Sequence, residues 1–139
     1  MPTASTSSAA NYNTRNFDEA ETHYLIAAEN PDYLALASGE LATMWLLDSG
    51  LEPAKGAAKA RLHVERLLKA HPKDANGLYL RIVLKAVSPK GSFDETLIHE
   101  FVAIADRADP RQERRRAEMV KVLAAIKKGT LSNITVEFE

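Results

Sequence analysis

Three prolines divide this chain into helical stretches of similar length. Each of them closes one amphipathic stretch and precedes the next, and they lie at Asn30-Pro31, His71-Pro72 and Asp109-Pro110. Proline cannot continue a helix from inside, but it is favoured in the first turn of the next helix. Helix pairs that are punctuated at roughly 40-residue spacing are typical of stacked helical repeats. The prolines therefore predict an all-helical chain built from helix pairs.

The composition is that of one globular domain. The 139 residues are 45% hydrophobic and 27% charged, which is enough to bury a core. Cysteine is absent, so disulfides, thiol nucleophiles and cysteine zinc sites are excluded. The N-terminus lacks the features of a secretory signal, and no apolar run reaches the roughly 20 residues that span a bilayer. We therefore expect a cytoplasmic protein that does not associate with a membrane.

Hydrophobic periodicity predicts six helices, near 17–29, 33–48, 53–71, 75–87, 92–107 and 110–128. Their expected starts are Pro53, Asp74, a capping box of Ser92 with Glu95, and Asp109-Pro110. Two helices should end at a left-handed glycine, Gly50 or Gly129. Residues 1–15 are expected to form a disordered tail, residues 16–129 the helical domain and residues 130–139 an extended tail. The alternating pattern within 133–138 either stays extended or pairs as a strand outside this chain.

The helices alternate between two kinds of surface. The first, third and fifth are apolar on one side, whereas the second and fourth are apolar on several sides. In stacked hairpins, one helix of each pair is enclosed by its partner and both neighbours. We therefore expect three antiparallel hairpins in a short array, with a compact bundle as the alternative. Gly39 costs the second helix about 1 kcal/mol of helix propensity, a cost that close approach of another helix would offset.

Three segments resemble the second helix of a tetratricopeptide repeat. In that family a small residue, then an aromatic or aliphatic residue, then an alanine precede the closing proline. The matching positions are Ala20, Tyr24, Ala27 and Pro31; Ala60, Val64, Leu67 and Pro72; and Ile98, Val102, Ala105 and Pro110. The resemblance implies a right-handed superhelical array, similar to tetratricopeptide proteins, whose concave surface grips a peptide or protein.

If this arrangement holds, the concave face is lined by Tyr33 and Glu40 from the second helix and by Tyr79, Arg81 and Lys85 from the fourth. Cations beside aromatic rings suit an acidic or carboxylate-bearing peptide. The alternative is that Tyr79 belongs to the core and that the two bases only extend along apolar surface.

A second basic group lies on the sixth helix, where Arg111, Arg114 and Arg115 share one face. A solvated outer face is the simplest interpretation, and docking of an acidic partner is the alternative. Nucleic acid is the least supported partner, because Glu113 and Glu118 interrupt the positive field and no aromatic residue is interleaved with it.

Enzymatic motifs are absent from the sequence. The four histidines have no metal-ligand spacing, and the glycines are scattered singly rather than grouped in a phosphate loop. We therefore expect no catalytic residue, no metal and no cofactor. The sequence favours a non-enzymatic adaptor or chaperone-like module that binds a protein or peptide. The alternatives are a structural subunit of a homo-oligomer or larger assembly and, with less support, a helical nucleic-acid-binding protein.

Overall fold

The computed structural model describes residues 9–139, with side chains from residue 16 onward. Six α-helices and no strand occur in this range, which confirms the all-helical prediction. A π-helical turn continues the second of these helices, and a short 3-10 turn follows the last. In chain order the elements are α2 (Ala9–Ala27), α3 (Leu34–Thr43), η1 (Met44–Asp48), α4 (Pro53–Ala70), α5 (Ala75–Val87), α6 (Glu95–Ile104), α7 (Pro110–Lys128) and η2 (Leu131–Asn133).

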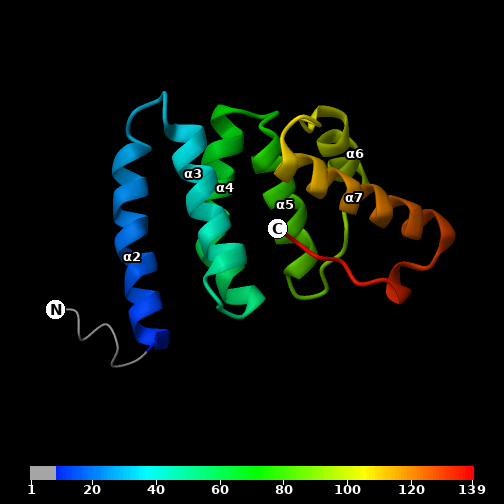
Figure 1. Ribbon diagram of the computed structural model, residues 1–139, viewed down its shortest axis with the longest axis horizontal. Helices are drawn as coiled ribbons and strands as arrows, with labels where there is room; N and C mark the ends of the chain where they lie inside the picture. Colours follow the sequence, from blue (N-terminus) through cyan, green and yellow to red (C-terminus); the bar gives the residue numbers. More distant parts are fainter. Residues whose placement is uncertain (1–8) are drawn as a thin grey trace.

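Each helix packs against the next one in the chain, and two further contacts skip one helix. These link α3 to α5 and α5 to α7. Figure 1 shows α2 and α3 upright and side by side, whereas α7 crosses obliquely at the opposite end of the molecule. The three helices α3, α5 and α7 therefore form one contiguous surface.

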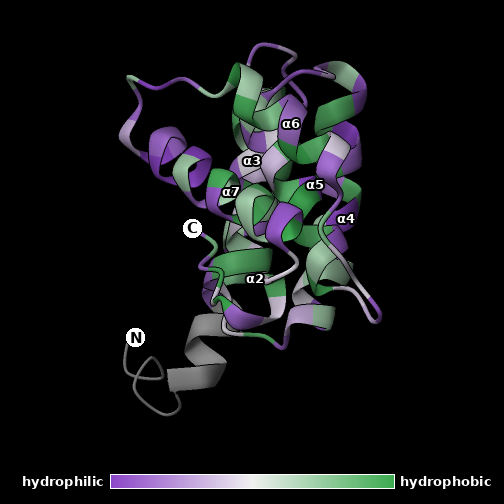
Figure 2. Ribbon diagram, turned by 90° about the vertical axis from the view of Figure 1, so that its right-hand side faces the viewer, coloured by the Kyte–Doolittle hydropathy of each residue, from purple (hydrophilic) through white to green (hydrophobic). Residues whose placement is uncertain are grey.

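Helix α5 is the centre of the core. Six of its hydrophobic side chains are buried, namely Leu78, Tyr79, Leu80, Ile82, Val83 and Leu84. They pack with buried residues of α3, α4, α6 and α7 in one cluster, and Figure 2 shows the apolar ribbon of α5 between its neighbours. Helix α3 is mostly buried too, but Leu36 is 65% exposed, so one apolar side of this helix is left uncovered. Only α5 is thus enclosed as fully as the sequence predicted.

Gly39 allows α3 and α5 to approach closely. A Cβ atom at this position would lie 2.5 Å from Nδ2 of Asn76 on α5, which is shorter than any ordinary contact. The expected compensation for a glycine within the helix is therefore present. The side chain of Asn76 therefore lies between Gly39 of α3 and Arg115 of α7.

Most helix ends follow the expected local chemistry. Asp74 accepts a hydrogen bond from Gly77 N (2.8 Å), and Asp109 accepts from two backbone N–H groups of the first turn of α7. Pro53 and Pro110 occupy first-turn positions of α4 and α7. Gly50 and Gly129 have φ of 76° and 71°, the left-handed conformation predicted for both.

Two predicted helix starts differ from the structure. Helix α2 begins at Ala9 rather than near residue 17, so residues 9–15 of the expected tail are helical, while residues 1–8 lie outside the described part of the chain. Helix α6 is capped by Asp94 and not by Ser92. The Oδ1 atom of Asp94 accepts a hydrogen bond from Leu97 N at 3.2 Å. Lys85 Nζ lies 2.8 Å from Asp94 Oδ2 and holds this carboxylate in place. A carboxylate fixed in this way is a stronger cap than a free hydroxyl.

In the part of the chain that the structure describes, no helix combines the length and apolar character needed to cross a bilayer.

Candidate functional site

The C-terminal segment, residues 134–139, lies extended across α5 and α7 (Figure 1). Its side chains alternate: Ile134, Val136 and Phe138 are half-buried, and the three residues between and after them are exposed. The Phe138 ring lies 6.5 Å from the ring of Tyr79 and 6.1 Å from that of Phe93, measured between centroids. The alternation seen in the sequence is therefore that of an extended segment packed on its own domain.

Side chains of α5 and α7 hold the backbone of this segment. Donors and acceptors both take part, as an extended chain requires. The bonds are Lys121 Nζ to Thr135 O (3.1 Å), Glu137 N to Glu118 Oε2 (2.9 Å), Glu139 N to Tyr79 Oη (2.9 Å) and Arg115 Nε to Glu139 O (2.7 Å). We call the surface formed by Tyr79, Arg115, Glu118 and Lys121 the groove.

Arg115 is the most unusual residue of the groove, because it is a charged side chain only 2% exposed. Its guanidinium carbon lies 4.1 Å from the centroid of the Tyr79 ring, and its Nη1 donates to Asn76 Oδ1 at 2.6 Å. Burial, assisted by the nearby positive charge of Arg111, lowers the pKa of Arg115 to about 10. Arg115 therefore remains charged at neutral pH, yet its Nη2 is buried without a hydrogen-bond partner among the described residues.

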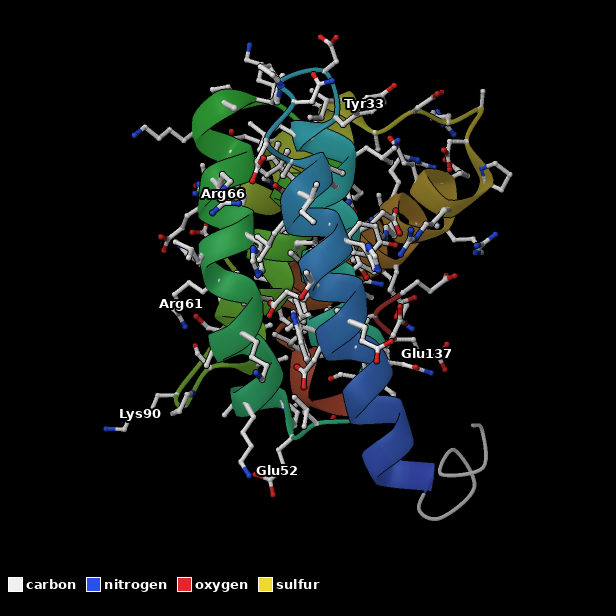
Figure 3. The ribbon with its side chains drawn as sticks, turned by 90° about the vertical axis from the view of Figure 1, so that its left-hand side faces the viewer. Tyr33, Glu52, Arg61, Arg66, Lys90 and Glu137 are labelled. Atoms are coloured by element: carbon white, nitrogen blue, oxygen red, sulfur yellow. The ribbon has the colours of Figure 1, made fainter. Side chains whose placement is uncertain are left out.

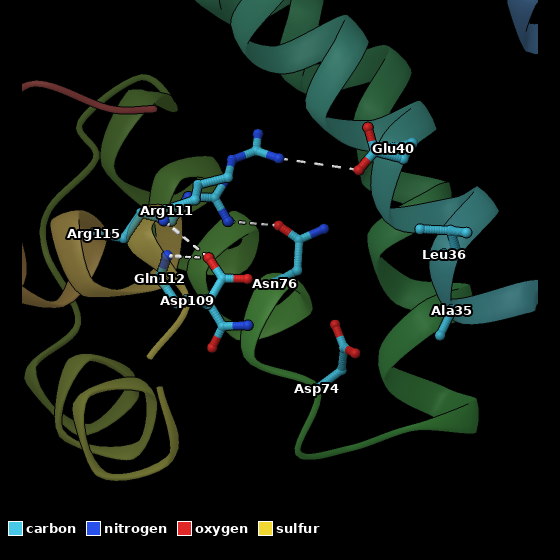
Figure 4. Close-up of a pocket in the computed structure, with 9 residues that line it drawn as sticks. All are labelled: Ala35, Leu36, Glu40, Asp74, Asn76, Asp109, Arg111, Gln112 and Arg115. Atoms are coloured by element: carbon cyan, nitrogen blue, oxygen red, sulfur yellow. Dashed lines mark hydrogen bonds and ion pairs between the residues drawn. The ribbon is translucent and has the colours of Figure 1, made fainter. Parts of the chain in front are cut away.

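A cleft of about 370 Å³ opens beside Arg115, between α3, α5 and α7. Figure 4 shows its lining, which combines an apolar wall with charged and amide groups: Ala35, Leu36, Glu40, Asp74, Asn76, Asp109, Arg111, Gln112 and Arg115. Arg111 and Glu40 face each other across it, with 4.0 Å between Nη1 and Oε1. Arg115 lines this cleft and also binds the C-terminal segment, so groove and cleft share this residue.

The five residues predicted to line a concave face do not lie together. Glu40 lines the cleft, and Tyr79 lies buried in the groove beneath Arg115. Tyr33 lies at the start of α3, 55% exposed, and does not line the cleft. Arg81 and Lys85 line a separate hollow of about 230 Å³ with residues of α4. The prediction therefore combined residues of two different surfaces.

Figure 3 illustrates this separation. Arg61, which lines the same hollow as Arg81, points outward from α4, as does Arg66. Glu137, from the C-terminal segment, points outward on the other side of the molecule.

The three arginines expected on one face of the last helix have different environments. Arg111 lines the cleft, Arg114 Nε lies 2.8 Å from the Glu139 carboxylate, and Arg115 is buried. The interpretation as a solvated outer face is thus wrong for Arg115. Its burial follows from the C-terminal segment and α5, which cover it and which helical periodicity cannot reveal.

Sequence reasoning missed Asn76, Glu118 and Lys121, which complete the groove and cleft. The one available signal concerned Asn76, an amide near the start of an otherwise apolar helix. Such a residue, paired with a glycine on a neighbouring helix, indicates a buried hydrogen bond at a close helix crossing. Glu118 and Lys121 carry no comparable signal, because their role depends on where the C-terminal segment lies.

A second buried polar cluster lies at the other end of the molecule and joins α2, η1 and α4. Glu21 Oε2 accepts from Trp45 Nε1 at 2.8 Å and lies 3.2 Å from His63 Nε2. Burial lowers the pKa of His63, although the neighbouring Glu21 carboxylate acts in the opposite direction. None of these three residues lines the cleft beside Arg115, and we interpret the cluster as structural.

Among the side chains that the structure describes, residues 16–139, no group of three or more histidine, aspartate or glutamate residues is arranged to hold a metal ion.

Comparison of the chain with protein-family models, with curated proteins and with solved structures found no match in any of the three.

Proposed function

We propose that this chain is a non-enzymatic module that binds a protein or peptide, and that an extended polypeptide is bound in the groove and cleft formed by α3, α5 and α7. One observation carries the proposal: the C-terminal segment lies extended in the groove, and side chains of the helices hold it.

The contacts are of a kind that any extended peptide can make. Alternate side chains enter the surface, as Val136 and Phe138 do, while backbone N–H and C=O groups bind side chains of the helices. Peptide-recognition surfaces obtain affinity from such backbone hydrogen bonds and specificity from pockets for alternate side chains. The groove thus provides general polypeptide binding, and its aromatic and charged residues provide selectivity.

The packing of the helices supports a tetratricopeptide-like arrangement as part of this proposal. Contacts link α3 to α5 and α5 to α7 in addition to those between consecutive helices. Stacked helical hairpins make contacts of this pattern between equivalent helices of neighbouring repeats, and these helices then form an extended binding surface. In this interpretation α3, α5 and α7 are the inner helices, and α2, α4 and α6 are the outer ones.

A peptide-array screen with charge-reversed variants tests the proposal. The groove variant is Arg111→Glu/Arg114→Glu, which reverses a cleft residue and the ion-pair partner of Glu139, and its matched control is Arg61→Glu/Arg81→Glu on the other surface. Both change the net charge equally and alter side chains that are at least partly exposed. We expect wild type and control to bind the same peptides and the groove variant to lose them. Equal binding by all three proteins would refute the assignment of the groove.

A further inference from the structure

The exposed face of α4 is strongly basic. The helix contains one acid, Glu65, and five bases, which are Lys55, Lys59, Arg61, Arg66 and Lys69. None of these bases forms an ion pair within the described part of the chain. Figure 3 shows Arg61 and Arg66 pointing outward, and Leu62 lies among the bases with more than half of its surface exposed. Ion pairs between described residues therefore leave the positive charge of this face uncompensated.

The exposed face of the neighbouring helix α2 is acidic. The chain contains no lysine or arginine between residues 16 and 54, and the exposed acids on α2 and the turn after it are Asp18, Glu19 and Glu29. Ile26 is more than half exposed on the same helix. Helices α2 and α4 adjoin, because Glu21 Oε2 lies 3.2 Å from His63 Nε2. The two helices thus form one outer surface with an acidic and a basic half, which we call the α2–α4 face.

Acids and bases lie at matching levels along this face. Figure 3 shows α2 and α4 running in the same direction, with their first residues at the same end of the molecule. At a rise of about 1.5 Å per residue, Asp18 and Lys59 precede the contact between the two helices by about 4.5 and 6 Å. Glu29 and Lys69 follow it by about 12 and 9 Å. Each acid therefore has a base at nearly its own level on the neighbouring helix.

We propose that the α2–α4 face binds a second copy of this chain about a two-fold axis parallel to the two helices, so that α2 of each copy lies on α4 of the other. Rotation about such an axis keeps every residue at its level. Asp18 of one copy then lies opposite Lys59 of the other, and Glu29 lies opposite Lys69. A two-fold axis across the helices would instead place α2 on α2 and α4 on α4, where like charges repel.

This contact would cover the exposed apolar side chains of both helices and leave the candidate site open. Ile26 and Leu62 lose exposed surface in the dimer, which adds a hydrophobic contribution to the electrostatic one. The groove and the cleft are formed by α3, α5 and α7 and contain no residue of α2 or α4. The dimer therefore goes beyond the proposed function, and it would present two grooves at once.

Charge reversal on the two halves of the face tests the inference on the full chain. Lys59→Glu/Lys69→Glu places a carboxylate opposite each acid of α2, and Asp18→Lys/Glu29→Lys places a base opposite each base of α4. We expect wild type to be a dimer in size-exclusion chromatography with light scattering at low salt. Its dissociation constant should rise about tenfold between about 0.05 M and 0.5 M salt, because salt screens the opposed charges. Each variant alone should dissociate at a roughly hundredfold higher concentration than wild type.

Mixing the two variants is the decisive measurement. In an equimolar mixture, each acidic half meets a basic half again, so the dimer should return. The matched control is Lys127→Glu/Lys128→Glu, which changes the net charge as the first variant does, at exposed residues of α7 on the other side of the molecule. This control should remain a dimer.

Far-UV circular dichroism verifies the helical content of each variant, because Lys59→Glu also removes a contact of 4.5 Å between Lys59 Nζ and the Trp45 ring. A variant that had only unfolded would not regain the dimer on mixing. A monomeric wild type at every salt concentration refutes the inference, as does a mixture that stays monomeric or a control that dissociates like the variants. Particles larger than a dimer would refute the two-fold arrangement. The peptide-array result is independent of all these outcomes, so the inference can fail while the proposed function stands.

Discussion

Each end of the molecule contains a buried polar cluster, but the hydrogen-bond partners in the two clusters come from different kinds of segment. At the N-terminal end, the carboxylate of Glu21 binds Trp45 and His63, and all three residues lie on helical turns that are held by their own packing. At the C-terminal end, Arg115 binds Asn76 and the backbone of Glu139, and the latter belongs to a segment outside any helix. The first cluster can open only if helices separate, whereas the second opens when the segment leaves.

The comparison shows that burial of a polar group does not by itself indicate function. Each cluster contains one buried atom without a partner among the described residues, Nδ1 of His63 and Nη2 of Arg115. Only Arg115 also lines a cleft and binds a segment that belongs to no helix. The combination of an unpaired donor, a cleft and an extended neighbouring segment is what distinguishes the candidate site.

The largest effect should follow loss of the arginine of the C-terminal cluster. Arg115→Met keeps much of the buried volume but leaves Asn76 Oδ1 and Glu139 O without their donor. We expect the free energy of unfolding to fall by about 3 kcal/mol, measured by urea denaturation. The matched control is Arg116→Met, whose side chain pairs with Glu113 along the surface of the same helix. A similar loss in both variants would contradict the structural role of Arg115.

Loss of the carboxylate in the N-terminal cluster should have the next largest effect. Glu21→Ala leaves Trp45 Nε1 without an acceptor and lowers the free energy of unfolding by roughly 2 kcal/mol. Glu21→Gln retains an amide oxygen for the indole and should recover part of this loss. If the two variants are equally unstable in urea denaturation, the hydrogen bond to Trp45 does not contribute.

The pH dependence of stability should distinguish the clusters further. Burial lowers the pKa of His63 in the folded protein below its ordinary value of 6.5, so the unfolded chain takes up a proton at higher pH than the folded one. Stability is therefore fully present above that ordinary value and is lost progressively as the pH falls below it. Urea midpoints measured between about pH 7.5 and pH 5 should show this decline.

The matched variant His63→Gln should lose less stability than wild type as the pH falls from about 7.5 to 5, because it lacks the imidazole that takes up a proton on unfolding. An identical slope in wild type and His63→Gln would assign the decline to other groups.

The smallest effect concerns one hydrogen bond between the groove and the segment. Tyr79→Phe keeps the ring beneath Arg115 and removes only the hydroxyl that accepts from Glu139 N. We expect a loss of about 0.5–1 kcal/mol of stability. In a Val136→Asp/Phe138→Asp background, which removes two apolar anchors of the segment and should release it, the same substitution should have no effect. A loss that persists there would show that the hydroxyl acts within the helices instead.

Local signals allowed most helix boundaries to be predicted from the sequence. Asp74, Asp109, Gly50 and Gly129 act through their own side chain or backbone and the adjacent turn, so their roles are visible in a few neighbouring residues. The cap of α6 was harder to predict from the sequence, because Ser92 and Asp94 are both suitable capping residues. The contact from Lys85, nine residues away, distinguishes them, and it depends on the tertiary structure.

The candidate site was predictable only in part for the same reason. Glu40, Tyr79, Arg111 and Arg115 were singled out from helix faces and do lie in the groove or cleft, although Arg115 was interpreted as part of a solvated outer face. Arg115 resembled a surface residue because two other arginines and a glutamate surround it in the sequence. Its burial depends on Asn76 and Glu139, which are 39 and 24 residues away along the chain. The peptide-binding role and the array geometry remain proposals that the experiments above address.

The π-helical turn at Met44–Asp48 has a consequence for the spacing of the chain. A π-helical turn takes up one residue more than an α-helical turn does, and each residue of an α-helix advances the side-chain direction by about 100°. Deleting a single residue here would restore a regular α-helix with the following residues facing nearly the same way, because about five residues of a π-helix turn the chain as far as about four of an α-helix. Comparisons of this chain with more distant sequences should therefore allow a one-residue gap at this point, since an alignment forced through it would pair inward-facing positions with outward-facing ones.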